Sequence, residues 1–182
     1  MQIEKTPIEG LIIIKPKIFE DERGYFFESY KKNKFTELGI NFDFVQDNIS
    51  KSKRGTVRGL HYQAGKYAQG KLCQALFGKV LDVSVDIRFG SPTFGKHFSV
   101  ELSEEKHNMI WIPPGFAHGF SVLSDEAIFS YKCTAFYSKE GERTILYDDA
   151  QLNINWKVDN PIVSKKDINA SKFSEIEKDF FL

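Results

Sequence analysis

The sequence predicts a mainly β fold, in which short strands form a sandwich or barrel that can close into a small jelly roll. Three observations favour this class. Apolar runs are short and closely spaced, turn-forming residues separate them, and aromatic residues, which favour strands, make up 14% of the chain. Because no repeat, linker or low-complexity tract interrupts the 182 residues, residues 1–182 are expected to form a single domain.

Ten apolar runs are expected to form strands, and turn sequences such as DERG, SKRG, FGSPTFG and PPG separate them. The run VLDVSVDI alternates cleanly, which places its aliphatic residues on one face and Asp82, Ser84 and Asp86 on the other. In chain order, the expected strands lie at residues 10–19, 24–31, 42–50, 56–63, 71–78, 79–87, 95–102, 108–113, 117–124 and 127–137.

Only two segments have a pattern typical of helices. The first is KKNKFTELG, residues 31–39, and the second is the stretch after Ser164. In that stretch SKFSEIEKDF begins with a serine that can cap a helix, and Phe173 and Ile176 lie at helical spacing. Helices should therefore be few, short and peripheral to the strands.

Charge and composition narrow the class of function. The 25 basic residues balance the 25 acidic ones, which argues against a dedicated nucleic-acid or membrane-surface protein but allows a local basic pocket for one phosphorylated small molecule. The first residues, MQIEKTPIEG, lack an apolar signal core, and no apolar stretch is long enough to span a membrane. We therefore expect a soluble, cytoplasmic protein, with Cys73 and Cys133 as buried, reduced thiols.

The stretch VRGLHYQ, residues 57–63, carries Arg58 and His61 in the middle of an apolar strand pattern. Their separation of three positions puts them on opposite faces of a regular strand, but Gly59 between them can form a bulge that redirects one of them. His61 is compatible with two interpretations, a core histidine bonded to a carbonyl group or a residue that takes part in chemistry.

Other polar residues stand against the apolar pattern. His118 follows a Pro-Pro-Gly turn. It is either a histidine at the rim of the fold beside that turn or a group that contacts a ligand from the start of a strand. Tyr131 lies in a strand pattern, where a tyrosine usually packs but can also act as a general acid. Asp167 comes late in the chain. Several cations flank apolar runs and, taken together, can line an anionic, nucleotide-like pocket: Arg23, Arg58, Lys71 and Lys166.

We expect no metal site. Metal sites in small β-barrels often combine a His-x-His pair with Glu and a further His, whereas the run here is His61-Tyr62-Gln63. Two of the four histidines, His97 and His107, lie in charged or exposed contexts. The second histidine of the His-x-His pair is therefore missing, because Gln63 stands in its place.

Seven blocks follow one another along nearly the whole chain: FEDERGYFFE (19–28), FVQDNISKSKRGTVRGLHYQ (44–63), AQGKL (68–72), VLDVSVDIRFGSPTFGK (80–96), WIPPGFAHGF (111–120), YKCTAFYSKEGE (131–142) and SKKD (164–167). Together they resemble the dTDP-4-dehydrorhamnose 3,5-epimerases, which are cupin-type sugar-nucleotide epimerases. The resemblance implies a double-stranded β-helix jelly roll. Tyr147, Phe136 and the loop 64–68 depart from the family pattern, but none of these departures removes a chemical group.

The resemblance implies an isomerase that acts on a dTDP-linked 4-keto-6-deoxy sugar. The 4-keto group acidifies the hydrogens on C3 and C5, so a base can remove one of them and an acid can return a proton to the opposite face. By this route dTDP-4-dehydro-6-deoxy-D-glucose becomes dTDP-4-dehydro-L-rhamnose. The reaction implies no redox cofactor and no metal, in keeping with the absence of a Gly-rich dinucleotide motif.

Four catalytic roles are implied by the same resemblance. His61 matches the base that abstracts the proton, and Asp167 matches its carboxylate partner, which would fix the tautomer and stabilise the imidazolium. Tyr131 matches the proton donor on the other face of the sugar. Lys71 matches the cation near the keto oxygen, where the charge of the enolate develops.

Substrate contacts are implied as well. Arg58 has the fork geometry that suits a diphosphate, and Tyr137 matches an aromatic residue that stacks on thymine. In the family the N-terminal strands exchange across a homodimer, so the substrate contacts expected near the N-terminus would serve the partner's site. The full set of implied contacts is Arg23, Glu28, Gln46, Asp47, Asn48, Arg58, Lys71, His118, Tyr137, Glu142 and Lys166.

Three other interpretations stay open. A related epimerase could act on a nucleotide 4-keto-6-deoxy sugar at C3 or C5 only. A metal-dependent cupin oxygenase would depend on stoichiometric iron or zinc. A non-catalytic nucleotide-sugar binder would have no need to keep His61, Tyr131, Lys71 and Asp167 together, because binding requires no acid–base pair.

Overall fold

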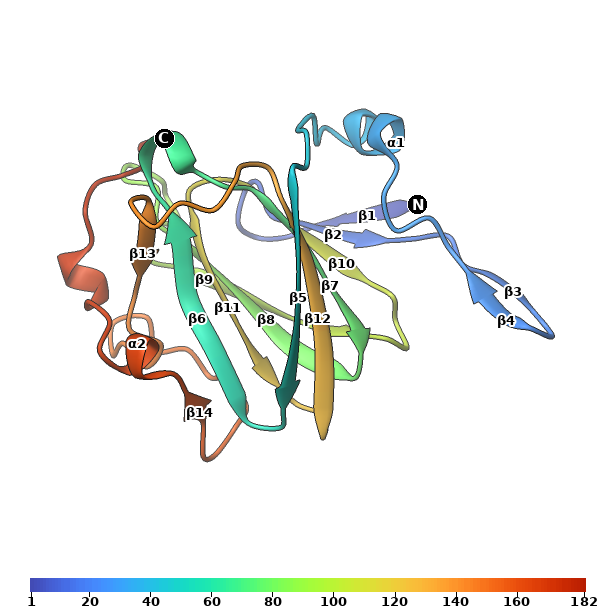
Figure 1. The fold of residues 1–182 in the computed structure, drawn as a ribbon. Coiled ribbons are helices and arrows are strands. Elements are labelled where there is room, and N and C mark those ends of the chain that lie inside the picture. Colours follow the sequence, from blue (N-terminus) through green and yellow to red (C-terminus); the bar gives the residue numbers. More distant parts are fainter.

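A computed structural model describes residues 1–182, and most of its regular structure is β-strand (Figure 1). The strands form two facing antiparallel sheets, which confirms the predicted jelly roll. The first sheet has the order β1 (Gln2–Lys5), β2 (Ile12–Lys15), β10 (Met109–Ile112), β7 (Lys71–Phe77), β12 (Glu126–Cys133) and β5 (Gln46–Lys53). The second sheet has the order β13 (Glu142–Thr144), β6 (Thr56–Gln63), β11 (Phe116–Val122), β8 (Lys79–Asp86) and β9 (His97–Ser103).

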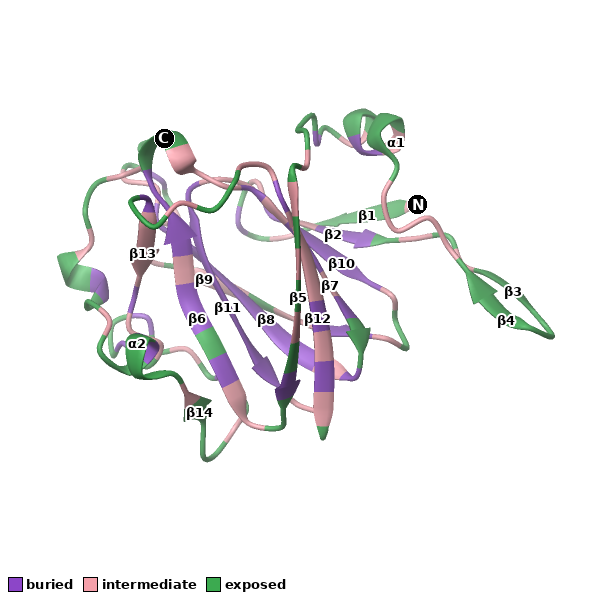
Figure 2. Ribbon diagram, in the orientation of Figure 1, coloured by how far each residue is buried: buried purple, intermediate pink, exposed green.

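Two small elements extend these sheets. Strand β14 (Ile162–Val163) pairs with β6 in parallel, which ties a late part of the chain to the middle of it. The hairpin of β3 (Phe19–Asp21) and β4 (Gly24–Phe26) projects away from the sheets as an exposed arm (Figure 2). A strand was expected to continue to residue 31, but β4 ends at Phe26, where the arm turns back toward the first helix.

Helices are few, short and peripheral, as predicted. They comprise α1 (Lys32–Glu37), α2 (Lys165–Ile168) and single 3₁₀ turns at Gly65–Tyr67 and Phe173–Glu175. None of the helices has the length and apolar character that crossing a membrane requires.

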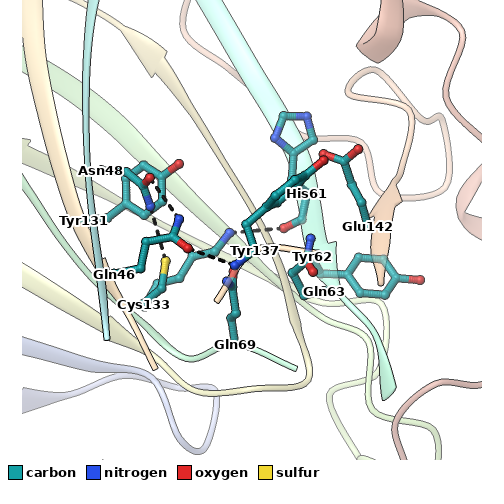
Figure 3. Close-up of a pocket in the computed structure, with 11 residues that line it drawn as sticks. Gln46, Asn48, His61, Tyr62, Gln63, Gln69, Tyr131, Cys133, Tyr137 and Glu142 are labelled. Carbon is teal, nitrogen blue, oxygen red and sulfur yellow. Dashed lines mark hydrogen bonds between the residues drawn. The ribbon is translucent and has the colours of Figure 1, made fainter. Parts of the chain in front are cut away.

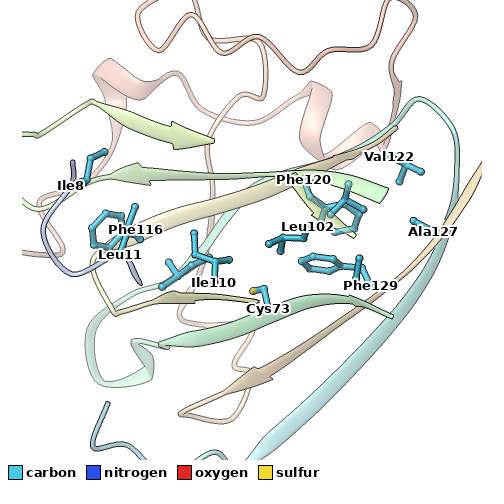
Figure 4. Packing of buried hydrophobic residues seen from close by; sticks show 13 residues of the cluster. Ile8, Leu11, Cys73, Leu102, Ile110, Phe116, Phe120, Val122, Ala127 and Phe129 are labelled. Carbon is cyan, nitrogen blue, oxygen red and sulfur yellow. The ribbon is translucent and has the colours of Figure 1, made fainter. Parts of the chain in front are cut away.

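The space between the two sheets holds one hydrophobic core (Figure 4). Phe120 of β11 stacks on Phe129 of β12, with ring centroids 4.3 Å apart, so an aromatic pair joins the sheets. A second core lies on the opposite face of the second sheet, where Leu81, Val83 and Phe173 pack together. The second sheet is therefore buried on both faces.

Burial on both faces explains why VLDVSVDI has a polar side that never meets solvent. Asp82, Ser84 and Asp86 are fully buried, while the aliphatic residues between them join the second core. The Asp86 carboxylate accepts hydrogen bonds from Arg88, Ser91 and Thr93. Burial raises the pKa of Asp86, but these hydrogen bonds outweigh it and hold the pKa below its ordinary value.

The helix expected over SKFSEIEKDF is wrong, because that segment forms only the 3₁₀ turn at Phe173–Glu175. Apart from the bonds within this turn and one from the Asp179 N–H to the Glu177 carbonyl, its backbone groups bond to neighbouring segments. The Ser171 carbonyl accepts from Leu146 at 2.8 Å, and the Phe180 carbonyl accepts from Phe89 at 2.9 Å. Phe173 and Ile176 face the second core, so packing against the sheet overrides the helical spacing.

Candidate active site

A cavity of about 340 Å³ opens between the two sheets (Figure 3). Strand β6 of the second sheet forms one wall, and strands β5, β7 and β12 of the first sheet form the other, together with the loop that leads to β13. The side chains that line it are mostly polar: Gln46, Asn48, His61, Tyr62, Gln63, Gln69, Lys71, Tyr131, Cys133, Tyr137 and Glu142. Seven of them were predicted as site residues from the sequence: Gln46, Asn48, His61, Lys71, Tyr131, Tyr137 and Glu142.

His61 and Asp167 form a hydrogen-bonded pair at this cavity. Nε2 of His61 lies 2.7 Å from Oδ1 of Asp167, which α2 places behind the imidazole. Ser164 caps α2 by accepting a hydrogen bond from the Asp167 N–H at 3.1 Å, so the helix begins where this carboxylate is needed. Because Nε2 donates to the carboxylate, Nδ1 is left with a lone pair that can accept a proton.

The charge of Asp167 is held by several donors. Burial raises the pKa of Asp167, but hydrogen bonds with His61, Ser164 and the Gly59 backbone lower it by more, so the pKa lies below its ordinary value. Asp167 is therefore an anion at neutral pH. A buried anion bonded to one nitrogen fixes the tautomer and stabilises the imidazolium that forms when the other nitrogen takes a proton.

Tyr131 and Lys71 line the wall opposite His61. Burial raises the pKa of the Tyr131 phenol to about 12, so the phenol is protonated at neutral pH and can donate. The Lys71 ammonium lies 5.8 Å from the centre of the Tyr131 ring and 3.5 Å from the carbonyl oxygen of His61. The cavity thus holds a proton acceptor, a proton donor and a cation.

A bulge in β6 brings Arg58 to the same side of the strand as His61. His61 lies opposite His118 of β11, and Arg58 lies opposite Phe120. Between these two pairs the chain advances three residues along β6 but only two along β11, so β6 contains one extra residue, which is a bulge. Gly59 has a φ of 137°, and a Cβ there would lie 2.5 Å from the Cα of Gly119. Arg58 reaches the first sheet, where its Nε donates to Ser52 of β5 at 3.1 Å.

His118 does not line the cavity but lies deeper between the sheets. Its Nε2 is 2.8 Å from Oδ2 of Asp82 and 3.9 Å from Sγ of Cys73. Burial lowers the pKa of His118 and outweighs the nearby Asp82 carboxylate, so the imidazole is held neutral. His118 was predicted to contact a ligand, but in the structure its imidazole lies outside the cavity lining and bonds to the buried Asp82.

Cys73, Asp82 and His118 also bring metal-binding atoms together, all within 4.8 Å of one another. Their chemistry fits a metal poorly. Burial raises the pKa of the Cys73 thiol well above its ordinary value, which disfavours the thiolate that binds metals.

Comparison with known proteins identifies the family. Residues 5–175 match the family model described as dTDP-4-dehydrorhamnose 3,5-epimerase. The chain belongs to the dTDP-4-dehydrorhamnose 3,5-epimerase family. It is 54% identical to the dTDP-4-dehydrorhamnose 3,5-epimerase of Shigella flexneri, with all of both chains covered.

Solved structures of epimerases share this fold. The dTDP-6-deoxy-D-glucose-3,5-epimerase of Legionella pneumophila, in complex with dTDP-4-keto-L-rhamnose, is 50% identical and superposes with a TM-score of 0.93 over 97% of this chain and 94% of that one. A 3'-monoepimerase from Streptomyces bikiniensis, in complex with dTDP-quinovose, is 32% identical, with a TM-score of 0.87 over 93% of this chain and 86% of that one. Solved structures of both single and double epimerases therefore share this fold.

Two of the predicted contacts of this epimerase lie on or beside the exposed arm, away from the cavity. Arg23 is at the tip of the arm, where it pairs with Asp21 at 2.6 Å. Glu28 follows β4 and pairs with Lys34 and Lys31. Neither side chain lines the cavity of its own chain.

Two further contacts lie at the edges of the site. Asp47 is exposed on the face of β5 opposite Gln46 and Asn48, and both its oxygens lie 2.9 Å from Lys132. Lys166 pairs with Glu142 at 2.5 Å beside the cavity. The roles of these residues stay predictions.

Four residues that line the epimerase cavity were not among those predicted: Tyr62, Gln63, Gln69 and Cys133. Gln63 carried a signal, since it is a polar residue in the apolar stretch VRGLHYQ. The other three carried none, because Tyr62 and Cys133 are typical packing residues and Gln69 lies in a loop.

Proposed function

We propose that this protein epimerises dTDP-4-dehydro-6-deoxy-D-glucose at both C3 and C5 to give dTDP-4-dehydro-L-rhamnose. The observation that carries the proposal is the His61–Asp167 pair, which faces a protonated Tyr131 across one cavity with Lys71 beside them. Proton transfer next to a keto group needs a base, an acid and a group that stabilises enolate charge. The family of the chain supports the same reaction.

In the proposed mechanism, Nδ1 of His61 takes a proton from a carbon next to the keto group. Asp167 stabilises the imidazolium that results, and the Lys71 ammonium lowers the energy of the enolate oxygen. Tyr131 then gives its proton to the opposite face of the carbon. These steps move only protons, so they require no redox cofactor.

The remaining polar wall would bind the nucleotide. Gln46 and Asn48 of β5, with Tyr137 and Glu142 from beyond β12, line the cavity and can contact the base and sugar. Arg58 lies beside them on the same side of β6, where its guanidinium can bind a diphosphate through paired charge-assisted hydrogen bonds.

We further propose a homodimer in which the arm exchanges between chains. Phe19, Tyr25 and Phe26 of the arm are exposed, and an apolar surface of this kind on a projecting hairpin favours burial against a partner. The exchange would bring Arg23 and Glu28 to the cavity of the partner chain, which accounts for their distance from the cavity of their own.

Proton NMR in deuterium oxide with dTDP-4-keto-6-deoxyglucose tests the reaction. Deuterium should enter at both C3 and C5, and the coupled product should have the L-rhamno configuration. Uptake at one carbon only would instead support a monoepimerase, and no uptake would contradict epimerisation. His61→Asn should abolish uptake while dTDP still binds, and activity should survive chelation, whereas loss on chelation would favour the metal-dependent alternative.

A further inference from the structure

The loop that carries Tyr137 lacks the usual means of support. It joins β12 to β13, and no backbone–backbone hydrogen bond involves residues 135–140. Phe136 and Tyr137 are 69% and 53% exposed, so neither ring is anchored in a core. Yet Tyr137 forms part of the cavity wall. Something other than packing or secondary structure must hold it there.

Three glutamine side chains supply the missing hydrogen bonds. Gln46 Oε1 accepts from the Tyr137 N–H at 2.8 Å, and Gln63 Oε1 accepts from the Ser138 N–H at 3.0 Å. On the other side of Tyr137, Gln69 Nε2 donates to the Ala135 carbonyl at 2.7 Å. These glutamines come from β5, from β6 and from the segment before β7, so the loop is held from three directions.

The backbone partners fix the orientation of each amide group. A backbone N–H can only donate and a carbonyl can only accept, so Gln63 must present its oxygen and Gln69 its nitrogen. Gln46 has a second task, because its Nε2 donates to Asn48 at 3.0 Å. The amide groups of Gln63 and Gln69 make no other hydrogen bond in the structure.

We propose that Gln63 and Gln69 are positioning residues, which hold Tyr137 against the cavity and thereby set the affinity for the nucleotide end of the substrate. The inference rests on the proposed function, in which Tyr137 contacts the nucleotide. Tyr137 would contact a part of the substrate that does not react, so its displacement should weaken ground state and transition state equally. KM should therefore rise while kcat stays the same.

Neutral substitutions remove each hydrogen bond without adding charge beside the anionic nucleotide. Gln63→Met loses the acceptor for the Ser138 N–H, and Gln69→Met loses the donor to the Ala135 carbonyl. Each should raise the Kd for dTDP and the KM about tenfold and leave kcat unchanged. Gln151→Met, at an exposed glutamine, serves as the control.

A double-mutant cycle with Tyr137→Ala separates positioning from general damage to the fold. If the glutamines act through Tyr137, Gln69→Met should have no further effect on dTDP affinity in the Tyr137→Ala background. An undiminished tenfold effect there would overturn the proposal, as would wild-type affinity in both Gln63→Met and Gln69→Met. All comparisons use variants whose unfolding midpoints match that of the wild type.

Hydrogen exchange tests the support of the loop without any ligand. The Tyr137 and Ser138 amides should be protected in the wild type, and the Ser138 amide should exchange faster in Gln63→Met. Unprotected amides in the wild type would overturn the positioning role whatever the substrate. A wild type that binds dTDP but incorporates no deuterium into the sugar would refute the proposed reaction and leave the positioning role standing.

Discussion

Nε2 of His61 and Oδ1 of Asp167 lie 2.7 Å apart although 106 residues separate them in the chain. The Asp167 side chain is 3% exposed and the His61 side chain 36%, so the pair presents its imidazole to the cavity and hides its carboxylate. The strength of the base therefore depends on a residue that the substrate does not touch.

Asp167→Asn should lower kcat by at least about 100-fold, because a neutral amide neither fixes the His61 tautomer nor stabilises the imidazolium. The Kd for dTDP should stay within about twofold, since Asp167 does not line the cavity. Steady-state kinetics and calorimetric titration measure the two effects. Asp159→Asn, at an exposed carboxylate, is the control, and an Asp167→Asn enzyme with a normal kcat would contradict the role of the pair.

Tyr131→Phe should slow epimerisation more than it slows solvent exchange at the sugar carbons. His61 would still remove the proton and return a deuteron to the same face, whereas delivery to the opposite face is lost. Since the pKa of Tyr131 is about 12, ionisation of this phenol should not limit the wild-type rate below about pH 10. Parallel NMR measurements of deuterium uptake and product formation check this, and equal losses would argue against Tyr131 as the donor.

Gly59→Ala should destabilise the protein by about 2–5 kcal/mol, because it combines an unfavourable φ with a clash against β11. Gly24→Ala is the matched control. Gly24 has a φ of 124°, close to the 137° of Gly59, but nothing lies within 4 Å of the position of its Cβ. Urea denaturation should show the larger loss at Gly59, and equal losses would mean that the close approach to Gly119 carries no cost.

Asp86 should contribute stability that depends on pH. Its pKa is lowered in the folded state, so the contribution is complete above the ordinary carboxyl pKa of about 4 and is lost as the pH falls through the lower folded value. Asp86→Asn should therefore reduce the free energy of unfolding at pH 7 by more than at pH 3. Urea denaturation at both pH values measures the difference, and a gap that does not narrow in acid would contradict the lowered pKa.

Phe26→Asp should shift the protein from dimer toward monomer, because it places a charge on the apolar surface of the arm. Phe181→Asp is the control, since Phe181 is a similarly exposed phenylalanine near the C-terminus. Sedimentation velocity measures the assembly state. A wild type that sediments as a monomer would refute the exchange of arms and leave Arg23 and Glu28 outside any site.

The strand pattern was predictable wherever residues alternate or form short apolar runs. The expected strand at 56–63 coincides with β6, and the one at 71–78 differs from β7 by one residue. The C-terminal segment could not be predicted in the same way, because Phe173 and Ile176 suit a helix and a strap along a sheet equally well. Only the presence of an open apolar face on the second sheet decides between them.

The site was predictable as a set of residues but not as a geometry. Spacing alone leaves Arg58 and His61 on opposite faces, and the bulge that reverses this depends on a close approach to Gly119 on another strand. The pairing of His118 with Asp82 was hidden for a similar reason, since the partner lies on a face of β8 that the sequence cannot identify as interior. Long-range pairings of this kind arise only once the sheets are assembled.

The position of Asp167 also sets an order of events during synthesis. Both sheets are built from residues before 145, apart from the short β14, whereas the carboxylate belongs to the segment that covers the outer face of the second sheet. In a chain made from its N-terminus, the strands that line the cavity therefore leave the ribosome before the partner of His61 does. The base acquires its carboxylate partner only when the last part of the chain has docked against the second sheet.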